Sequence, residues 1–237
     1  MVPDKMLTLT TKQKSIIEQA INVFETGSRW GNYACLAFLP DGPNGMVQVT
    51  YGRSQTTEFG NLKKLLSDYV ACGGKWAKEC EPYLPKIGRN PLSQDNDFLS
   101  ILSSAGKSDP IMALVQDRFF EDNYFQPALS WANSHGFEKP LSLLVIYDSY
   151  IQSGGIKGFL RKRFPAKVPS DGGSEEEWIK QYVDARGKWL SGHSNKILRP
   201  TVYRMKCMNK QISLNNWNLD ILPIETQGVK ITGDTRA

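Results

Sequence analysis

The segment from residue 9 to residue 53 constrains the fold of this chain more than any other part of the sequence. Its first half carries apolar residues at helical spacing, namely Ile16, Ile17, Ala20, Ile21 and Phe24. This spacing predicts an amphipathic helix, which a threonine at 10 or 11 can cap and Gly27 can end. Residues 33–40 and 46–53 then predict two strands of a β-hairpin, joined by the turn-forming residues 41–45.

Glu25 follows the apolar residue Phe24 directly, so we expect its side chain at the edge of the buried face of the helix. Desolvation at such a position raises the pKa of a carboxyl group, as a general acid requires. An ordinary surface glutamate near a helix end is the commoner outcome for this pattern. The general acid is therefore a hypothesis that needs further support.

The chain has 237 residues, enough for one large or two-lobed domain, and its 40% hydrophobic and 22% charged residues are typical of a globular protein. It contains no apolar run near the roughly 20 residues that span a membrane, so we expect no integral membrane segment. The N-terminus lacks the pattern of a signal peptide. From these features alone, either the protein is cytoplasmic, or it leaves by a route that needs no cleaved signal, or the sequence is a fragment of a longer chain.

Cysteine and histidine are too few and too scattered to predict a metal site. The four cysteines lack metal-ligand spacing and there are only two histidines, so we expect no metal and no cofactor. Cys72 and Cys80 could pair in a disulfide or remain free thiols, and the sequence leaves both open.

The formal net charge is +5, with basic runs at 63–64, 161–163 and 206–210. Such runs are usually solvated faces, but they could also attract an anionic polymer. No nucleic-acid-binding motif accompanies them, so we expect no nucleic-acid partner, and we expect a monomer.

Beyond the hairpin the sequence is mostly helical. Apolar periodicity and capping signals predict helices at about 61–71, 76–84, 98–104, 110–132, 137–153, 174–190 and 200–208. The segment 137–153 is apolar nearly all round, which is typical of a buried central helix. Residues after Leu214 are expected to be extended. The sum is a mainly α (α+β) fold with one small sheet.

Four segments in order resemble one family. They are Val23-Phe24-Glu25-Thr26-Gly27-Ser28; Tyr124-Phe125-Gln126-Pro127-Ala128 with Ile146-Tyr147-Asp148-Ser149-Tyr150-Ile151-Gln152-Ser153-Gly154; Tyr182-Val183-Asp184-Ala185-Arg186; and Tyr203-Arg204-Met205 with Asn216-Trp217-Asn218-Leu219-Asp220. They are similar to the "VFENG", "YF-PA", "YD--IQHG", "FLDAR" and "GNLDL" motifs of the bacterial family 46 chitosanases, which belong to the lysozyme superfamily. The resemblance runs over nearly the whole chain.

The resemblance implies a two-lobed lysozyme-like fold, with a small β-hairpin lobe, a larger helical lobe and a cleft between them in a single catalytic domain, 1–237. It implies an endo-acting, inverting glycoside hydrolase whose general acid is Glu25. It also implies that Asp148, Arg186 and Arg204 lie behind Glu25 as a supporting network. A carboxylate in so apolar a helix as 137–153 is costly unless it is paired, so this role is physically sensible.

The hairpin departs from the family pattern. The position of the second acid falls on Asp41, but the candidate water-holding Thr50 comes nine residues later, further along than in the family. Asp41 could therefore be only a turn-forming residue at the hairpin tip. Glu58 and Thr50 are the substitutes for positioning water. The family helix also carries a histidine where this chain has Ser153.

Substrate residues are predicted around the hairpin. Trp30, Tyr33 and Tyr51 could stack on sugar rings, although core packing is the commoner role of such residues. The family binds the glucosamine amine with an aspartate, and the closest match here is Asn61. Chitosan is a polycation, whereas peptidoglycan has N-acetyl sugars and net negative charge, so Asn61 and the +5 charge favour peptidoglycan.

We therefore expect an amino-sugar polysaccharide as the partner, with a muramidase-like antibacterial effector or lysin as the first interpretation. Such a substrate implies action in the periplasm or outside the cell, with export by another route or as part of a larger protein. A chitosanase is the alternative. A non-catalytic glycan-binding module of the cell wall is the alternative of another class, because a fold does not guarantee activity.

Overall fold

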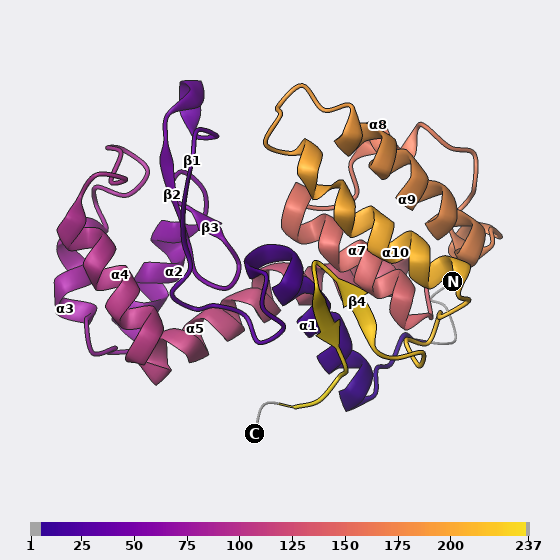
Figure 1. Cartoon of the computed structure of the whole chain (residues 1–237), viewed down its shortest axis with the longest axis horizontal. Helices are drawn as coiled ribbons and strands as arrows, with labels where there is room; N and C mark the ends of the chain where they lie inside the picture. Colours follow the sequence, from indigo (N-terminus) through magenta and orange to yellow (C-terminus); the bar gives the residue numbers. More distant parts are fainter. Residues whose placement is uncertain (1–5, 236–237) are drawn as a thin grey trace. The chain divides into compact units, whose positions relative to one another are not determined.

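A computed structural model describes residues 6–235, which fold into two compact units (Figure 1). Of the described residues, 6–29 and 123–235 form one unit, which is helical apart from a small hairpin near its C-terminal end. The other unit runs from Trp30 to Asp122 and holds the predicted β-hairpin. The predicted mainly α, two-lobed fold is confirmed.

The first helix, α1 (Thr11–Thr26), has the predicted boundaries and caps. The Thr10 hydroxyl accepts a hydrogen bond from the Gln13 backbone N–H, and the Gln13 side chain accepts one from the Thr10 N–H, which forms a capping box. Gly27 ends the helix with a φ of 69°, a left-handed conformation that glycine adopts without strain. These caps fix where the helix stops and so place Glu25 in its last turn.

The centre of the helical unit is α7 (Pro140–Ser153). Its residues from Pro140 to Ser149 are all buried, which confirms the predicted central helix. It packs against α1 and against three other helices, α6 (Gln126–Ser134), α9 (Glu175–Ser191) and α10 (Tyr203–Ser213) (Figure 1). The short helix α8 (Gly158–Arg161) packs on α9. Any polar side chain on α7 must therefore find its partners on these neighbours.

The C-terminal tail forms a second sheet that the sequence did not predict. Strands β4 (Ile224–Thr226) and β5 (Val229–Ile231) pair antiparallel, and they pack on α10 and α1 respectively. Three residues per strand are too few to show a clear alternation of apolar and polar residues. The predicted extended backbone is found in these strands, but residues 214–219 form turns, and the pairing was not foreseen.

The second unit contains a three-stranded antiparallel sheet in the order β1 (Leu36–Leu39), β2 (Gln48–Tyr51) and β3 (Thr56–Thr57). The strands β1 and β2 are shorter than predicted. At one end the Gly42 N–H donates to the Met46 carbonyl and closes a turn. At the other end Gly52, with a φ of 78°, turns the chain away from the sheet.

The helices of the second unit are α2 (Leu62–Ala71), α3 (Ala77–Cys80), α4 (Asn96–Ser108) and α5 (Pro110–Phe120). The helix predicted over residues 110–132 is present, but a π-helical turn interrupts its α-helical pattern. The helix α5 ends at Phe120, a π-helical turn covers Glu121–Phe125, and α6 then begins. Pro127 lacks the N–H that a continuous helix would need, and the boundary between the two units falls in this turn.

None of the four cysteines is in a disulfide, so Cys72 and Cys80 are not joined. In the described part of the chain, no helix is both long and apolar enough to cross a membrane.

Candidate active site

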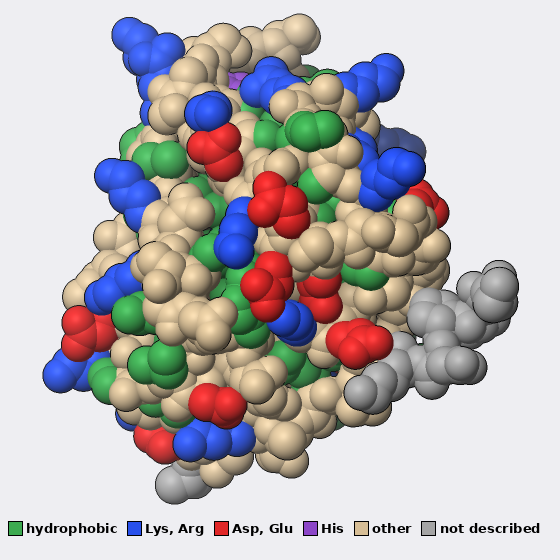
Figure 2. Space-filling model, turned by 90° about the vertical axis from the view of Figure 1, so that its right-hand side faces the viewer, with side chains coloured by type: hydrophobic (Ala, Val, Ile, Leu, Met, Phe, Trp, Pro, Cys, Tyr) green, Lys and Arg blue, Asp and Glu red, His purple; other side chains and the backbone are tan. Residues whose placement is uncertain are grey.

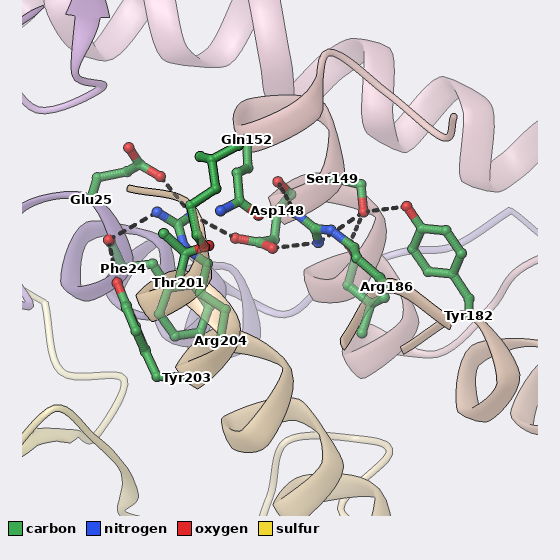
Figure 3. A network of polar contacts seen from close by, with 12 residues as sticks. Phe24, Glu25, Asp148, Ser149, Gln152, Tyr182, Arg186, Thr201, Tyr203 and Arg204 are labelled. Carbon is green, nitrogen blue, oxygen red and sulfur yellow. Dashed lines mark hydrogen bonds and ion pairs between the residues drawn. The ribbon is translucent and has the colours of Figure 1, made fainter. Parts of the chain in front are cut away.

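Glu25 lies in the last turn of α1 with only 8% of its side chain exposed. Its Oε1 accepts a hydrogen bond from Arg204 Nη1 at 2.7 Å. The neighbouring carbonyl of Phe24 accepts hydrogen bonds from Arg204 Nη2 at 3.0 Å and from the Tyr203 hydroxyl at 2.6 Å (Figure 3). The start of α10 therefore holds both the end of α1 and the carboxyl group that it carries.

Asp148 joins two arginines behind Glu25. Its Oδ1 accepts from Arg204 Nη1 at 2.9 Å, and its Oδ2 accepts from Arg186 Nη1 at 2.5 Å (Figure 3). The side chains of Asp148 and Arg186 are fully buried. The structure thus brings together four predicted residues from four helices, and their charges cancel when Glu25 is ionised. We name these residues the carboxylate–arginine cluster: Glu25, Asp148, Arg186 and Arg204.

Three further residues support this cluster and were not singled out from the sequence. Ser149 accepts a hydrogen bond from Arg186 Nη1 at 3.1 Å and one from the Tyr182 hydroxyl at 2.9 Å. Gln152 Oε1 accepts from Arg186 Nη2 at 2.5 Å. All three lie inside the motifs that carry the family resemblance, which is the signal that could have found them.

Burial raises the pKa of the Glu25 carboxyl group above its ordinary value. The positive charge and hydrogen bond of Arg204 oppose this rise, the negative charge of Asp148 adds to it, and Arg186 opposes it. Desolvation is the largest of these effects. Glu25 therefore holds its proton to a higher pH than an exposed glutamate does, which is the property of a general acid.

The raised pKa has a consequence for stability. Because the folded protein binds the Glu25 proton more tightly than the unfolded chain, this group stabilises the fold fully below its unfolded pKa of about 4.5, and that contribution is lost as the pH rises through the folded pKa. We therefore expect the Tm of Glu25→Gln, minus the Tm of wild type, to increase as the pH rises from 4 to 8. Thermal melts at constant ionic strength measure it. A difference that stays constant or moves the other way would contradict the raised pKa.

The predicted second acid, Asp41, lies in the exposed turn after β1. Its Oδ1 accepts a hydrogen bond from Gln48 Nε2 at 2.8 Å, and Gln48 Oε1 accepts from the Phe59 N–H at 3.0 Å. The carboxylate is thus both accessible and held by β2. Thr50, also on β2, is buried, and its hydroxyl has no hydrogen-bond partner among the described residues.

The prediction that Glu58 can position water is wrong. Its side chain is only 1% exposed, and its two carboxylate oxygens accept hydrogen bonds from the backbone N–H groups of Val49 at 3.1 Å and Leu92 at 2.8 Å. It therefore fastens β2 to the loop that precedes α4.

The predicted sugar-stacking role of Tyr51 is also wrong. Tyr51 is 0% exposed, and its hydroxyl donates to the Leu102 carbonyl at 2.8 Å, so no face of the ring can meet a sugar. Trp30 and Tyr33 are half-buried, with the Tyr33 hydroxyl donating to Asp117 at 2.9 Å, and Asn61 is exposed at the start of α2. These three remain predictions.

No group of three or more histidine, cysteine, aspartate or glutamate side chains within residues 6–235 is arranged to hold a metal ion.

A mainly helical fold with a small antiparallel sheet, and a buried glutamic acid braced by paired arginines, are the features of a glycoside hydrolase of the lysozyme-like type. The chain belongs to glycosyl hydrolase family 46, whose family model matches residues 19–223. This match includes residues of both compact units, and the prediction that they form one catalytic domain stays a prediction.

Relatives of known structure and sequence agree with this assignment. A chitosanase of Bacillus subtilis (strain 168) is 28% identical over 230 residues, which cover 90% of this chain and 81% of the relative. A mutant chitosanase from Bacillus subtilis MY002, complexed with 6 GlcN, is 25% identical with a TM-score of 0.82, and the match covers 94% of this chain and all of the other. A family 46 chitosanase of Gynuella sunshinyii in complex with chitotetraose shares the fold at 22% identity, with a TM-score of 0.79, coverage of 97% of this chain and 100% of the other.

Proposed function

We propose that this protein is an endo-acting chitosanase that hydrolyses β-1,4 bonds between glucosamine units. The observation that carries the proposal is the buried, arginine-braced Glu25 in a chain of family 46. The choice of chitosan is supported by the relatives, which are chitosanases at 25–28% identity over most of both chains. The peptidoglycan reading that net charge and Asn61 favoured has no such support.

Glu25 acts as the general acid in this proposal. Its carboxyl group donates a proton to the glycosidic oxygen while the bond from that oxygen to the anomeric carbon breaks, so the leaving sugar departs as an alcohol. The developing carboxylate stays in its contact with Arg204, which Asp148 and Arg186 hold in place. An arginine serves here because it keeps its charge at every relevant pH.

Asp41 acts as the general base, removing a proton from a water molecule that attacks the anomeric carbon from the opposite face. Attack from that face inverts the anomeric configuration. Its hydrogen bond from Gln48 supports this role, because it holds an otherwise exposed carboxylate in one orientation. Thr50 assists by holding the water. Trp30, Tyr33 and Asn61 contact the sugar chain, and the sugar-bearing surface includes the hairpin.

Chitosan chains are too large to cross a membrane, so we place the action of the enzyme outside the cytoplasm. The route by which the protein reaches its substrate stays a prediction, as does its monomeric state.

Product analysis with two polymers tests the proposal. Purified protein is incubated separately with chitosan and with purified peptidoglycan, and new reducing ends and product sizes are measured. We expect short glucosamine oligomers from chitosan, with the α-anomer appearing first by NMR, and unchanged peptidoglycan. Glu25→Gln is the control for a contaminating hydrolase. Products from peptidoglycan alone would establish the muramidase reading, and binding without products from either polymer would favour the non-catalytic module.

A further inference from the structure

The side-chain amide of Gln152, in the last turn of α7, uses its oxygen in a hydrogen bond but not its nitrogen. Its Oε1 accepts from Arg186 Nη2 at 2.5 Å. Its Nε2 is buried and has no hydrogen-bond partner among the described residues. Buried polar groups in native proteins are nearly always satisfied, so an unused donor on a residue that contacts the carboxylate–arginine cluster needs an explanation.

The orientation of this amide is fixed by chemistry. Arginine carries only donors, so the oxygen of Gln152 must face Arg186 and the Nε2 must face away from it. Arg186 cannot rotate freely to accept another arrangement, because Asp148 and Ser149 hold its Nη1 at 2.5 and 3.1 Å. Figure 3 shows the Gln152 side chain reaching the cluster near Arg204 and Asp148, beside Glu25.

When Glu25 loses its proton, the oxygen that carried the proton becomes a hydrogen-bond acceptor. The Oε1 of Glu25 is occupied by Arg204 Nη1, and its second oxygen accepts no hydrogen bond from the described residues although it then shares the negative charge. The charged and titratable groups of the helical unit that act on Glu25 are Arg204, Asp148 and Arg186, and Glu25 in turn acts on Tyr203. Among them only Arg204 donates to the Glu25 carboxylate, so a second donor would stabilise the ionised form.

We propose that Gln152 is a positioning residue for the general acid, and that Arg186 aims its Nε2 so that it donates a hydrogen bond to the Glu25 carboxylate once the proton has left. This inference rests on the proposed function for its catalytic meaning. Arg186 then acts on Glu25 in two ways, through Asp148 and Arg204 on one side and through Gln152 on the other.

Two variants separate the donor from the acceptor. Gln152→Glu keeps an oxygen for Arg186 but removes the donor, whereas Gln152→Met has a similar length and removes both. The pKa of Glu25 is measured by NMR titration of ¹³C-labelled carboxyl groups, with the Glu25 signal assigned by its loss in Glu25→Gln. We expect Gln152→Met to raise the Glu25 pKa by about one unit, the effect of losing one hydrogen bond to a charged group. We expect Gln152→Glu to raise it further, because this variant also adds a negative charge nearby. The basic limb of the kcat profile should move upward by the same amount.

Every other pattern overturns the proposal. A shift in Gln152→Met alone would mean that Gln152 only anchors Arg186, and a shift in Gln152→Glu alone would reflect the added charge. No shift in either variant would leave the Nε2 without a role. The matched control is Ser142→Ala, which removes a buried, unpaired hydroxyl near the opposite end of α7 and should leave the Glu25 pKa unchanged.

The titration also keeps this inference separate from the proposed function. It reads the Glu25 carboxyl group directly and needs no substrate. A wild-type protein that fails to cleave chitosan would contradict the proposed function while the titration still decides the role of Gln152.

Discussion

Glu25→Gln is expected to lower kcat on chitosan by about 10²–10⁴-fold while the protein stays folded, because a general acid contributes about that factor. The amide has nearly the same shape as the carboxyl group, and its oxygen can still accept from Arg204 Nη1, so the contact at 2.7 Å can persist. It cannot supply a labile proton to the leaving oxygen. The loss should therefore appear in kcat far more than in KM, since the ground-state contacts with the sugar chain are kept.

Initial rates on chitosan at several pH values, with circular dichroism to confirm the fold, measure this effect. Glu225→Gln is the matched control, because it makes the same chemical change at a half-exposed carboxylate on β4. It should keep the wild-type rate. Activity of Glu25→Gln within about tenfold of wild type would exclude Glu25 as the general acid, and an equal loss in Glu225→Gln would point to a general effect on the protein.

The sequence predicted those parts of the site that depend on helical periodicity. The stripe from Ile16 to Phe24 placed Glu25 at the end of α1, and the apolar run around Tyr147 predicted a buried central helix. From that burial alone Asp148 had to be paired. Its partners came from the family resemblance, because periodicity within one helix does not show which neighbouring helix lies against it.

Residues of the hairpin unit were predicted less well, because their roles depend on contacts across long sequence separations. Whether Glu58 is buried depends on its contact with the Leu92 N–H. Whether Tyr51 is buried depends on the contact of its hydroxyl with the Leu102 carbonyl. Neither contact leaves a local signal in the sequence. Alternation in a short strand tells which residues share a face, but not which face is covered.

Net charge is a weak guide to the substrate of a protein for a physical reason. The +5 is a sum over the whole chain, whereas attraction at a site depends on the charges within about 10 Å at ordinary ionic strength. Many of the cations are already in pairs, as Lys188 is with Asp184 and Lys139 with Glu176. The total therefore says little about whether a cationic or an anionic polymer is bound near Glu25.

Arg186→Ala and Asp148→Ala are each expected to destabilise the protein by about 3–5 kcal/mol and to lower activity. Removing one partner of a buried ion pair leaves the other uncompensated where water cannot reach it. Both side chains are 0% exposed, and their contact at 2.5 Å joins α7 to α9. Asp148→Ala also removes the hydrogen bond from Arg204, so Arg204 is no longer held in the orientation in which it contacts Glu25. Urea denaturation monitored by fluorescence gives the free energy of unfolding. The kcat of each variant is measured without urea, at a temperature below the Tm of that variant.

A surface ion pair on the same helix provides the matched control. Lys188 and Asp184 lie 2.7 Å apart, but their side chains are 74% and 60% exposed, so Lys188→Ala should change stability by no more than about 1 kcal/mol. Arg186→Lys is the more informative second variant, because it keeps the charge and loses the fork that holds Asp148, Ser149 and Gln152 together. We expect it to retain more stability than Arg186→Ala and still to lose activity. Buried-pair variants no less stable than Lys188→Ala would show that the carboxylate–arginine cluster does not hold the helical unit together, and that Glu25 must be braced in another way.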